Sequence, residues 1–425
     1  MILVLLFFYI SNILFAQQSF VTASNGQFIS EGKPYYYIGV NYWYGGLVAN
    51  DNIGKERIRK ELDFLKAKGV DNLRVMAGAE GFGQINGVPR VEPAFQPKPG
   101  VFNKKLLHGL DFLLAEMGKR KMKAIIFLSN NWEWSGGFLQ YLNWNGLIPD
   151  SVLQRKLSWD EMRDYVSLFY SCKNCIKQYE KQVKIIVNRV NPITKKSYKN
   201  DPAIMSWEIA NEPRPMRSTA IENYKNFISR AASYIKKLDK KHLITIGSEG
   251  EMGSENIDVF TAIHADVNIN YTTIHIWPKN WSWFRDTSIV SSFNDVVSKT
   301  SDYILKHAAV SKQLGKPLVI EEFGLPRDSH SFSFTAPTVY RDKYFTSIFD
   351  KLLTHAESNG VIAGANIWTF SGSGRPSYKQ LLWKKGDDVL GDPPVEEQGL
   401  NSLFDCDKST WDIIINYTNK FSIIK

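Results

Sequence analysis

The sequence predicts an α/β fold in which eight parallel strands close into a barrel. Three observations support this prediction: apolar strands alternate with amphipathic helices, no Pro/Gly/Ser-rich linker divides the chain, and its length suits one barrel with long loops. Near-continuous apolar strands are typical of parallel sheets that are covered on both faces. The eight candidate strands are residues 35–39, 72–76, 124–128, 204–209, 243–246, 271–275, 318–320 and 364–368.

Helices are predicted after these strands because apolar residues recur every three or four positions. The first two helices have apolar faces made of Ile58, Leu62 and Leu65 and of Leu106, Leu110, Leu113 and Met117. Asn103 occupies the position of an N-cap before the second helix. Later helices are expected over residues 221–238, 295–314 and 340–358.

A doubly wound open sheet is the alternative architecture for alternating strands and helices. It would carry a Gly-rich phosphate-binding turn after its first strand, whereas here Gly39 leads into Asn41, Tyr42, Trp43 and Tyr44. The long connection over residues 129–201 has room for a large active-site loop as well as a helix. We therefore predict a (β/α)8 TIM barrel that forms a single catalytic domain over residues 17–425.

The first 16 residues contain no charged side chain and are mostly Leu, Ile, Phe and Val. Polar residues follow Ala16, so residues 1–16 are predicted to be a secretory signal peptide. An uncleaved membrane anchor is the alternative, but the run is short for a bilayer span and contains Ser11 and Asn12. We expect a secreted, extracellular protein, or a periplasmic one, that does not bind the membrane after cleavage.

The charged residues and cysteines exclude several other classes of protein. The net charge is +9, but the basic residues are scattered rather than gathered in a stripe, so we expect no nucleic-acid partner. The seven histidines show no metal-ligand spacing, and no metal is expected. Cys172 and Cys175 are one helical turn apart and can form a disulfide in an exported protein, with two buried thiols as the alternative.

Polar and aromatic residues gather at the predicted C-terminal ends of the strands, where barrel enzymes hold their reacting groups. Glycoside hydrolysis needs one carboxylic acid to protonate the leaving oxygen and a second carboxylate across the sugar ring. Glu212 after strand four and a glutamate of strand seven, Glu321 or Glu322, provide such a pair. Strand parity does not choose between the latter two.

Neighbouring residues suit the same chemistry. The Asn211 amide can donate to a sugar hydroxyl, and Arg74 can hold the strand-seven carboxylate ionised. Trp132, Trp134 and Trp368 offer flat apolar faces to sugar rings.

Each of these residues also has an ordinary structural interpretation, since strand-end glutamates often cap helices and loop tryptophans often only pack. Glu249 and Glu251 are interpreted in this way. Glu208 is expected to form a structural pair deeper in the barrel.

These residues resemble glycoside hydrolase family 5, and within it the endo-β-1,4-mannanase branch. The Asn-Glu-Pro motif at residues 211–213 and the Glu-Phe-Gly motif at 322–324 are shared across the superfamily. The Asn-Asn-Trp…Ser-Gly-Gly segment at 130–137 and the Arg214 extension of Asn-Glu-Pro are more specific to mannanases. Further matching stretches are residues 248–250, 275–278 and 391–394, so the resemblance covers nearly the whole chain after the leader.

The resemblance implies a retaining, endo-acting hydrolase of β-1,4-mannosidic bonds in mannan, galactomannan or glucomannan, without metal or organic cofactor. It makes Glu212 the acid/base and selects Glu322 over Glu321 as the nucleophile. We expect a monomer whose partner is the β-mannan polysaccharide substrate. The residues implied to bind that substrate are Arg74, Asn131, Trp132, Asn211, Arg214, His275, Trp277 and Trp368.

Trp277 departs from the family pattern. Many relatives place a Tyr there, and its hydroxyl bonds the nucleophile, whereas an indole N–H donates one hydrogen bond and cannot accept or titrate. The double-displacement mechanism also predicts carboxyl groups ~5–5.5 Å apart. It requires a protonated Glu212, whose pKa we expect to be raised by the charge of Glu322.

Two other functions stay open at this stage. A β-1,4-glucanase would use the same fold and carboxylates but treat the 2-hydroxyl of the sugar differently. A non-catalytic carbohydrate-binding barrel is the more distant alternative, because such proteins usually lack one of the two carboxylates.

Overall fold

The structure is a computed structural model that describes residues 19–285, 288–378 and 380–424; the predicted leader, residues 1–16, lies outside them. At its centre is an eight-stranded sheet in which all the paired strands run parallel. In chain order the strands are β4 (Tyr37–Asn41), β5 (Asn72–Met76), β8 (Lys123–Phe127), β9 (Ile204–Glu208), β10 (Leu243–Thr245), β11 (Thr272–Ile276), β12 (Leu318–Phe323) and β13 (Ile362–Ile367).

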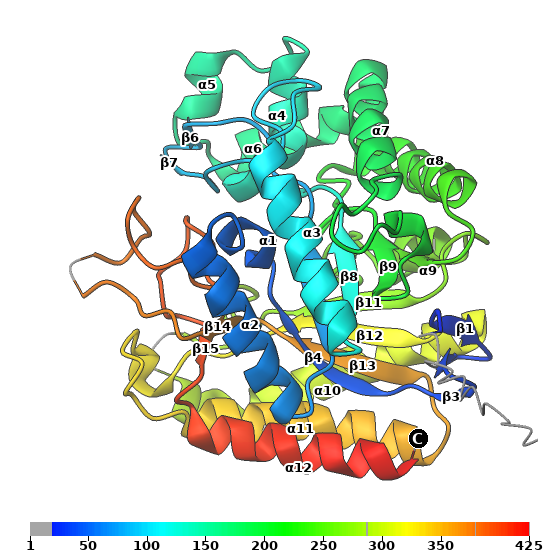
Figure 1. The fold of residues 1–425 in the computed structure, drawn as a ribbon, viewed down its shortest axis with the longest axis vertical. Helices are drawn as coiled ribbons and strands as arrows, with labels where there is room; N and C mark the ends of the chain where they lie inside the picture. Colours follow the sequence, from blue (N-terminus) through cyan, green and yellow to red (C-terminus); the bar gives the residue numbers. More distant parts are fainter. Residues whose placement is uncertain (1–18, 286–287, 379, 425) are drawn as a thin grey trace, which may run out of the picture.

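The sheet curls into a barrel because its first and last strands, β4 and β13, pair with each other. The remaining seam lies between β10 and β11. There the Asn270 N–H donates to the Ile244 carbonyl (2.8 Å) and the Thr245 hydroxyl donates to the Tyr271 carbonyl (3.0 Å). The predicted (β/α)8 barrel is confirmed (Figure 1).

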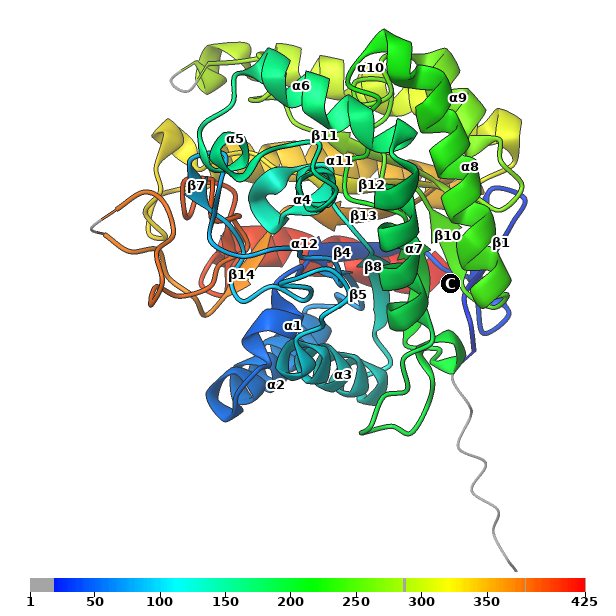
Figure 2. The same ribbon diagram turned by 90° about the horizontal axis from the view of Figure 1, so that it is seen from above.

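Helices follow the strands and surround the barrel (Figure 2). They are α2 (Asn52–Ala67), α3 (Lys104–Lys119), α7 (Lys173–Val187), α8 (Ile221–Leu238), α9 (Ile257–His264), α10 (Ile289–Leu314), α11 (Val339–Glu357) and α12 (Lys408–Ile424). Asn103 caps α3 as predicted, accepting from the N–H groups of Lys105 (3.1 Å) and Leu106 (3.3 Å). No helix of the described part of the chain has the length and apolarity needed to cross a bilayer.

Several predicted boundaries differ from the observed ones, for example at the starts of β4 and α10. β4 begins at Tyr37 and not at Tyr35, because the Tyr35 N–H donates to the Phe28 carbonyl (2.9 Å) in a small N-terminal sheet. That sheet consists of β1 (Thr22–Ser24), β2 (Gln27–Ser30) and β3 (Lys33–Pro34), and Phe28 packs on the ring of Tyr271 (5.2 Å). α10 begins at Ile289, earlier than the predicted residue 295.

Two long segments add to the barrel. The first joins β8 to β9 and contains α4 (Gly137–Trp144), α5 (Asp150–Gln154) and α6 (Trp159–Ser167), which lie near the β6–β7 hairpin (Gln84–Ile85 and Val88–Pro89) at the top of Figure 1. A disulfide joins Cys172 to Cys175 at the start of α7, so the disulfide alternative is the correct one, and Cys406 is free.

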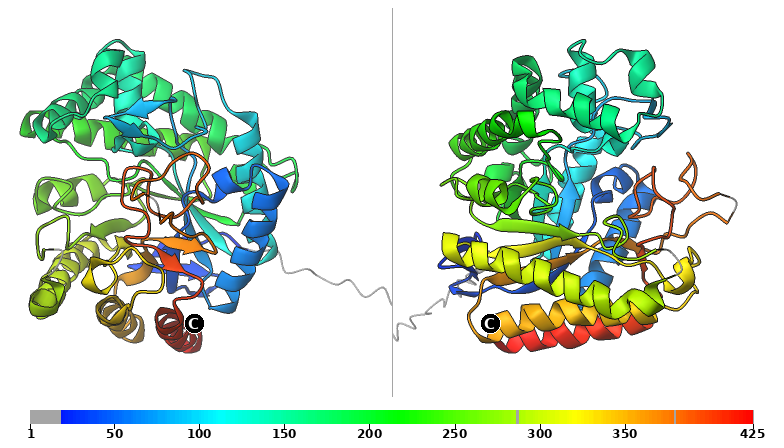
Figure 3. Two further views of the ribbon diagram at one scale, coloured as in Figure 1. Left: turned by 90° about the vertical axis from the view of Figure 1, so that its left-hand side faces the viewer. Right: turned by 180° about the vertical axis from the view of Figure 1, so that it is seen from behind.

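The second segment lies between β14 (Phe370–Gly372) and β15 (Leu403–Phe404), and its described residues, 373–378 and 380–402, form the orange loop of Figure 3. In the same figure α12 lies alongside α11 and completes the outer layer of helices.

Candidate active site

Arg74, on β5, organises the polar residues at the C-terminal end of the barrel. Its side chain is completely buried, and all five of its N–H groups donate hydrogen bonds. Two go to the carboxylate of Glu208 (2.8 and 2.6 Å), which is therefore the structural pair that the sequence predicted. The other three acceptors are Asn41 (3.0 Å), Asn211 (2.7 Å) and Glu322.

Glu322 faces the cavity from the end of β12. Arg74 Nη1 donates to Glu322 Oε1, and His275 Nδ1 lies 3.4 Å from Glu322 Oε2. A register shift after Ile274 in the β11–β12 ladder pairs His275 with Glu322 rather than with Glu321. The side chain of Glu321 is completely buried, with Oε2 3.8 Å from His275 Nε2.

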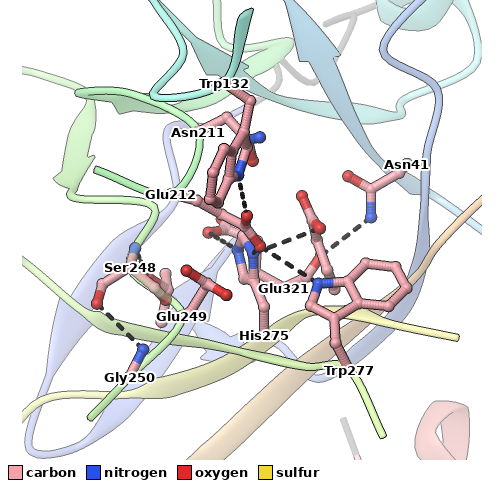
Figure 4. Close-up of polar contacts among 12 residues, drawn as sticks. Asn41, Trp132, Asn211, Glu212, Ser248, Glu249, Gly250, His275, Trp277 and Glu321 are labelled. Carbon is pink, nitrogen blue, oxygen red and sulfur yellow. Dashed lines mark hydrogen bonds and ion pairs between the residues drawn. The ribbon is translucent and has the colours of Figure 1, made fainter. Parts of the chain in front are cut away.

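Glu212 lies just after β9, where its backbone has a left-handed φ of 51° that few residues other than glycine adopt. Its N–H donates to the Gly247 carbonyl (2.9 Å), which fixes this conformation. Three N–H groups point at its carboxylate (Figure 4): Trp132 Nε1 at Oε2, and His275 Nδ1 (2.6 Å) and Trp277 Nε1 (3.3 Å) at Oε1.

The turn that brings Trp132 over Glu212 requires glycine. Gly137 has a φ of +53°, and a Cβ there would lie 2.2 Å from the Asn130 carbonyl oxygen. The Gly137 N–H donates to the buried carboxylate of Glu80 (3.0 Å). The Ser-Gly-Gly sequence is thus explained by the turn it forms.

The order of the two carboxyl pKa values is the reverse of the one expected, since Glu212 has the lower pKa and Glu322 the higher one. Burial raises the pKa of Glu212, but the hydrogen bond and charge of His275 outweigh it and lower that pKa to about 2. Burial raises the pKa of Glu322 to about 8 against the attraction of His275 and Arg74. The expectation was wrong because His275 bonds Glu212 and because Arg74 shares its charge with Glu208.

A cavity of about 660 Å³ opens above these carboxylates. Six of the chain's 12 tryptophans line it, which suits the apolar faces of sugar rings. The lining consists of Trp132, Glu133, Trp134, Trp159, Asn211, Glu212, Arg214, Glu249, Met252, Trp277, Lys279, Asn280, Trp281, Ser282, Glu322, Trp368, Val395, Glu396, Glu397, Leu400 and Asn401.

A comparison with known protein families gives a match over nearly the whole chain. A family model described as "GH family 5 beta-mannosidase-like" matches residues 18–425. The chain belongs to this family. It is a glycoside hydrolase, as the motifs around Glu212 and Glu322 predicted.

Several relatives of this family 5 hydrolase are known. Mannan endo-1,4-beta-mannosidase 4 of Solanum lycopersicum is 30% identical over 376 residues, which cover 86% of each chain. The crystal structure of the family 5 mannosidase from Rhizomucor miehei matches with a TM-score of 0.85 and 30% identity over 96% of this chain and 98% of that one. The endo-1,4-beta-mannanase of the same organism has a TM-score of 0.66 at 23% identity over 96% of this chain and 99% of that one, which shows the shared fold.

Some of the predicted substrate-binding residues line the cavity of this family 5 hydrolase, and others are buried behind its lining. Trp132, Asn211, Arg214, Trp277 and Trp368 line it. The side chains of Arg74, Asn131 and His275 are completely buried outside the described lining, and each contacts a residue that lines it. Their contact with substrate stays a prediction.

Asn131 and Asn211, two residues predicted to bind the substrate, are held in place by hydrogen bonds of their own side chains. Asn131 Oδ1 accepts from the Arg214 N–H (3.2 Å), and Asn211 Nδ2 donates to Asn130 Oδ1 (3.1 Å). An amide nitrogen carries two N–H groups, so the bond from Asn211 to a sugar hydroxyl stays a prediction.

The Tyr that many relatives place at the position of Trp277 bonds the nucleophile, whereas Trp277 contacts the other carboxylate of the pair. Its Nε1 donates to Glu212 (3.3 Å), the residue predicted to be the acid/base, and its ring packs edge-on against Trp368 (5.9 Å). Glu249, interpreted as a bystander, lines the cavity and accepts two hydrogen bonds from Arg214 (2.5 and 2.6 Å).

Other cavity residues were not predicted. Trp159 comes from α6, and Glu396, Glu397 and Asn401 come from the segment between β14 and β15. The sequence gives no periodic signal for such loop residues; the Gly-Asp-Pro-Pro stretch at 391–394 was the nearest pointer. Its Asp392 accepts from the N–H groups of Gly399 and Asn401 (2.9 Å each) and from the Ser402 hydroxyl (2.5 Å), which fixes this cavity wall.

Glu212, His275 and Glu322 also form the one described cluster whose ligand atoms, within 4.8 Å of one another, could hold a metal ion. The neighbouring carboxylates raise the pKa of His275 to about 10, although burial alone would lower it. In the structure these three side chains pair with one another, with His275 Nδ1 2.6 Å from Glu212 and 3.4 Å from Glu322.

We predict that activity falls as the pH rises through about 8. The two carboxyl groups hold one proton between them from about pH 2 to about pH 8, and such values belong to the pair. The predicted mechanism needs a protonated Glu212 and an ionised Glu322, so it too requires the pair to hold one proton. Above about 8 the proton is lost and no general acid is left, so kcat/KM should fall tenfold per pH unit there.

The pH prediction is checked by initial rates between about pH 3 and pH 10, with activity remeasured at neutral pH to exclude denaturation. A rate that increases through pH 8 would contradict the shared proton, since it would mean that Glu322 alone must be ionised for activity.

Proposed function

We propose that the protein is a secreted, endo-acting β-1,4-mannanase that works by double displacement with retention of configuration. Glu322 attacks the anomeric carbon while Glu212 protonates the departing chain, which gives a glycosyl-enzyme. Glu212, now a base, takes a proton from water, and the resulting hydroxide oxygen displaces Glu322 from the anomeric carbon. Both displacements invert that carbon, so the product keeps the β configuration.

One observation carries the proposal. One carboxylate oxygen of Glu212 and one of Glu322 lie within 4.8 Å of each other, and both residues line the aromatic-rich cavity. That spacing suits a nucleophile in direct contact with the sugar, at ~5–5.5 Å between carboxyls, and is too short for an intervening water at ~6.5–9.5 Å.

The named relatives support mannan as the substrate, and the apolar leader supports secretion. The curated relative from tomato is a mannan endo-1,4-beta-mannosidase, and one structure of the Rhizomucor miehei mannosidase is a complex with mannosyl-fructose. A disulfide between Cys172 and Cys175 is typical of proteins from oxidising compartments.

A second candidate is an exo-acting β-mannosidase that removes single sugars from chain ends. It is favoured by one comparison, because the R. miehei mannosidase has a higher TM-score (0.85) than the R. miehei endo-mannanase (0.66). Both candidates cleave the same bond and use the same carboxylates. They differ in whether the cavity accepts sugars on both sides of that bond.

We expect unbranched β-mannan to be cleaved to oligosaccharides, with the β-anomer of the new reducing end appearing first. The measurement is proton NMR of early products together with chromatography, with galactomannan, glucomannan and carboxymethyl-cellulose incubated in parallel. Mannose as the sole early product would select the exo-acting candidate, and faster cleavage of carboxymethyl-cellulose would select a glucanase. An α-anomer as first product would refute double displacement.

A further inference from the structure

Trp159 is a large aromatic side chain that the proposed mechanism does not use. It is the first residue of α6 and is 53% exposed while lining the cavity. Its position is fixed by a capping box: Glu161 N–H donates to the Ser158 hydroxyl (3.3 Å) and Ser158 N–H donates to the Glu161 carboxylate (2.9 Å). An exposed but rigidly placed Trp in a cavity wall is suited to bind a ligand ring.

The start of α6 is also tied to the loop that carries Glu212. Arg163 Nε donates to the Met216 carbonyl (2.8 Å), and Arg217 Nε donates to Asp164 (2.7 Å). These two hydrogen bonds join α6 to the loop after β9, and so fix the position of Trp159 relative to Glu212.

Trp159 and Trp132 together form what we call the aromatic platform. Their ring centroids are 6.2 Å apart, and the ring planes differ by 28°. The guanidinium of Arg214 lies 4.9 Å from the centre of the Trp132 ring and holds it in place. The platform thus places two stacked, nearly parallel rings in the cavity wall.

The platform lies on the leaving-group side of the bond that is cleaved. Glu212 directs Oε1 toward His275, the neighbour of Glu322, and directs Oε2 toward Trp132 (Figure 4). A sugar whose anomeric carbon is beside Glu322 and whose glycosidic oxygen is beside Glu212 must extend its leaving chain past Glu212. Trp132 is met first along that path, and Trp159 lies beyond it.

We propose that Trp159 binds the second sugar of the leaving chain, a β-linked hexopyranose, and the matching sugar of an acceptor in transglycosylation. This inference rests on the proposed hydrolysis of β-mannan and specifies which end of the substrate the site holds. Trp159 is then a specificity residue for chain length and not part of the proton-transfer machinery.

Trp159→Ala should lower kcat/KM for mannohexaose about tenfold, the scale of one lost ring contact. It should leave kcat/KM for 4-nitrophenyl β-mannoside within about twofold, because that leaving group has no second sugar. With the aryl mannoside as donor and mannotriose as acceptor, the ratio of transfer to hydrolysis should also fall about tenfold. Trp159→Phe should restore most of each loss. Phe82→Ala is the control, since Phe82 is another exposed aromatic residue (66%) and lies outside the described lining.

Equal losses on mannohexaose and the aryl mannoside, or an unchanged transfer ratio, would overturn the role of Trp159. Wild-type turnover of mannohexaose tests the proposed function separately. A wild type that cleaves cellohexaose and the aryl β-glucoside instead of the mannosides is a separate outcome. In that case the effect of Trp159→Ala on kcat/KM is compared between these two glucosides, and the same criteria apply to the role of Trp159.

Discussion

Glu322→Ala should reduce hydrolysis of mannan about 10⁵-fold, the scale seen when a covalent nucleophile is removed. The variant cannot form the glycosyl-enzyme, while Glu212 and the cavity stay in place. Azide should restore turnover of a 2,4-dinitrophenyl β-mannoside, because a small anion fits the space of the lost carboxylate. Attack from that side inverts the anomeric carbon once, so the product should be α-mannosyl azide, which NMR identifies.

Two glutamates serve as controls for this variant. Glu251, which pairs with Lys306 (2.5 Å) outside the described cavity lining, is the matched control, and Glu251→Gln should keep nearly full activity. Glu321→Ala tests the choice between the two adjacent strand-seven glutamates. If Glu321→Ala lost as much activity as Glu322→Ala and azide rescued only Glu321→Ala, the nucleophile would be Glu321.

Arg74→Lys should lower both activity and stability. Lysine has three N–H donors on a single nitrogen and cannot reproduce the five bonds of the guanidinium fork. The buried carboxylate of Glu208 would lose its bidentate partner, which costs about 3–5 kcal/mol in the free energy of unfolding. Glu322 and Asn211 would shift as well, and a displacement on the 1 Å scale lowers kcat about a hundredfold.

Denaturant unfolding and kcat, measured on the same preparation, check the Arg74 prediction. Arg230→Lys is the control, since Arg230 is half-exposed and makes a comparable two-bond pair with Glu180 (2.6 and 2.9 Å). It should change the free energy of unfolding by less than about 1 kcal/mol. A stable but inactive Arg74→Lys would instead mean that Arg74 serves catalysis without holding the barrel together.

The barrel and its carboxylate pair could be predicted from the sequence because both depend on local patterns. Strands buried on both faces are continuous apolar runs, and a parallel barrel places every strand's C-terminal end on one rim. Glu208 and Glu212 could be assigned different depths from their order at the C-terminal end of one strand. Family motifs then selected Glu322, and the register shift beside His275 supplies the structural reason for that choice.

The remaining features depend on contacts between segments far apart in the chain. The order of the two pKa values follows from which carboxylate His275 bonds, and no spacing in the sequence encodes that choice. Trp277 was recognised as unusual, yet only the structure places its N–H on Glu212. Trp159 and Glu396 reach the cavity from two long insertions whose paths are set by packing rather than by periodicity.

The wall formed by residues 392–402 is fastened independently of the reacting groups. Asp392 ties both ends of this loop together, and Gly391 anchors it through its carbonyl to Trp43 (2.5 Å) and through its N–H to Ser371 (2.9 Å). Residues 395–397, which line the cavity, take no part in these anchoring bonds. Side chains at positions 395–397 can therefore change without removing the bonds that Asp392 and Gly391 make. In an evolving lineage, substrate preference can diverge at this loop while the chemistry is inherited unchanged.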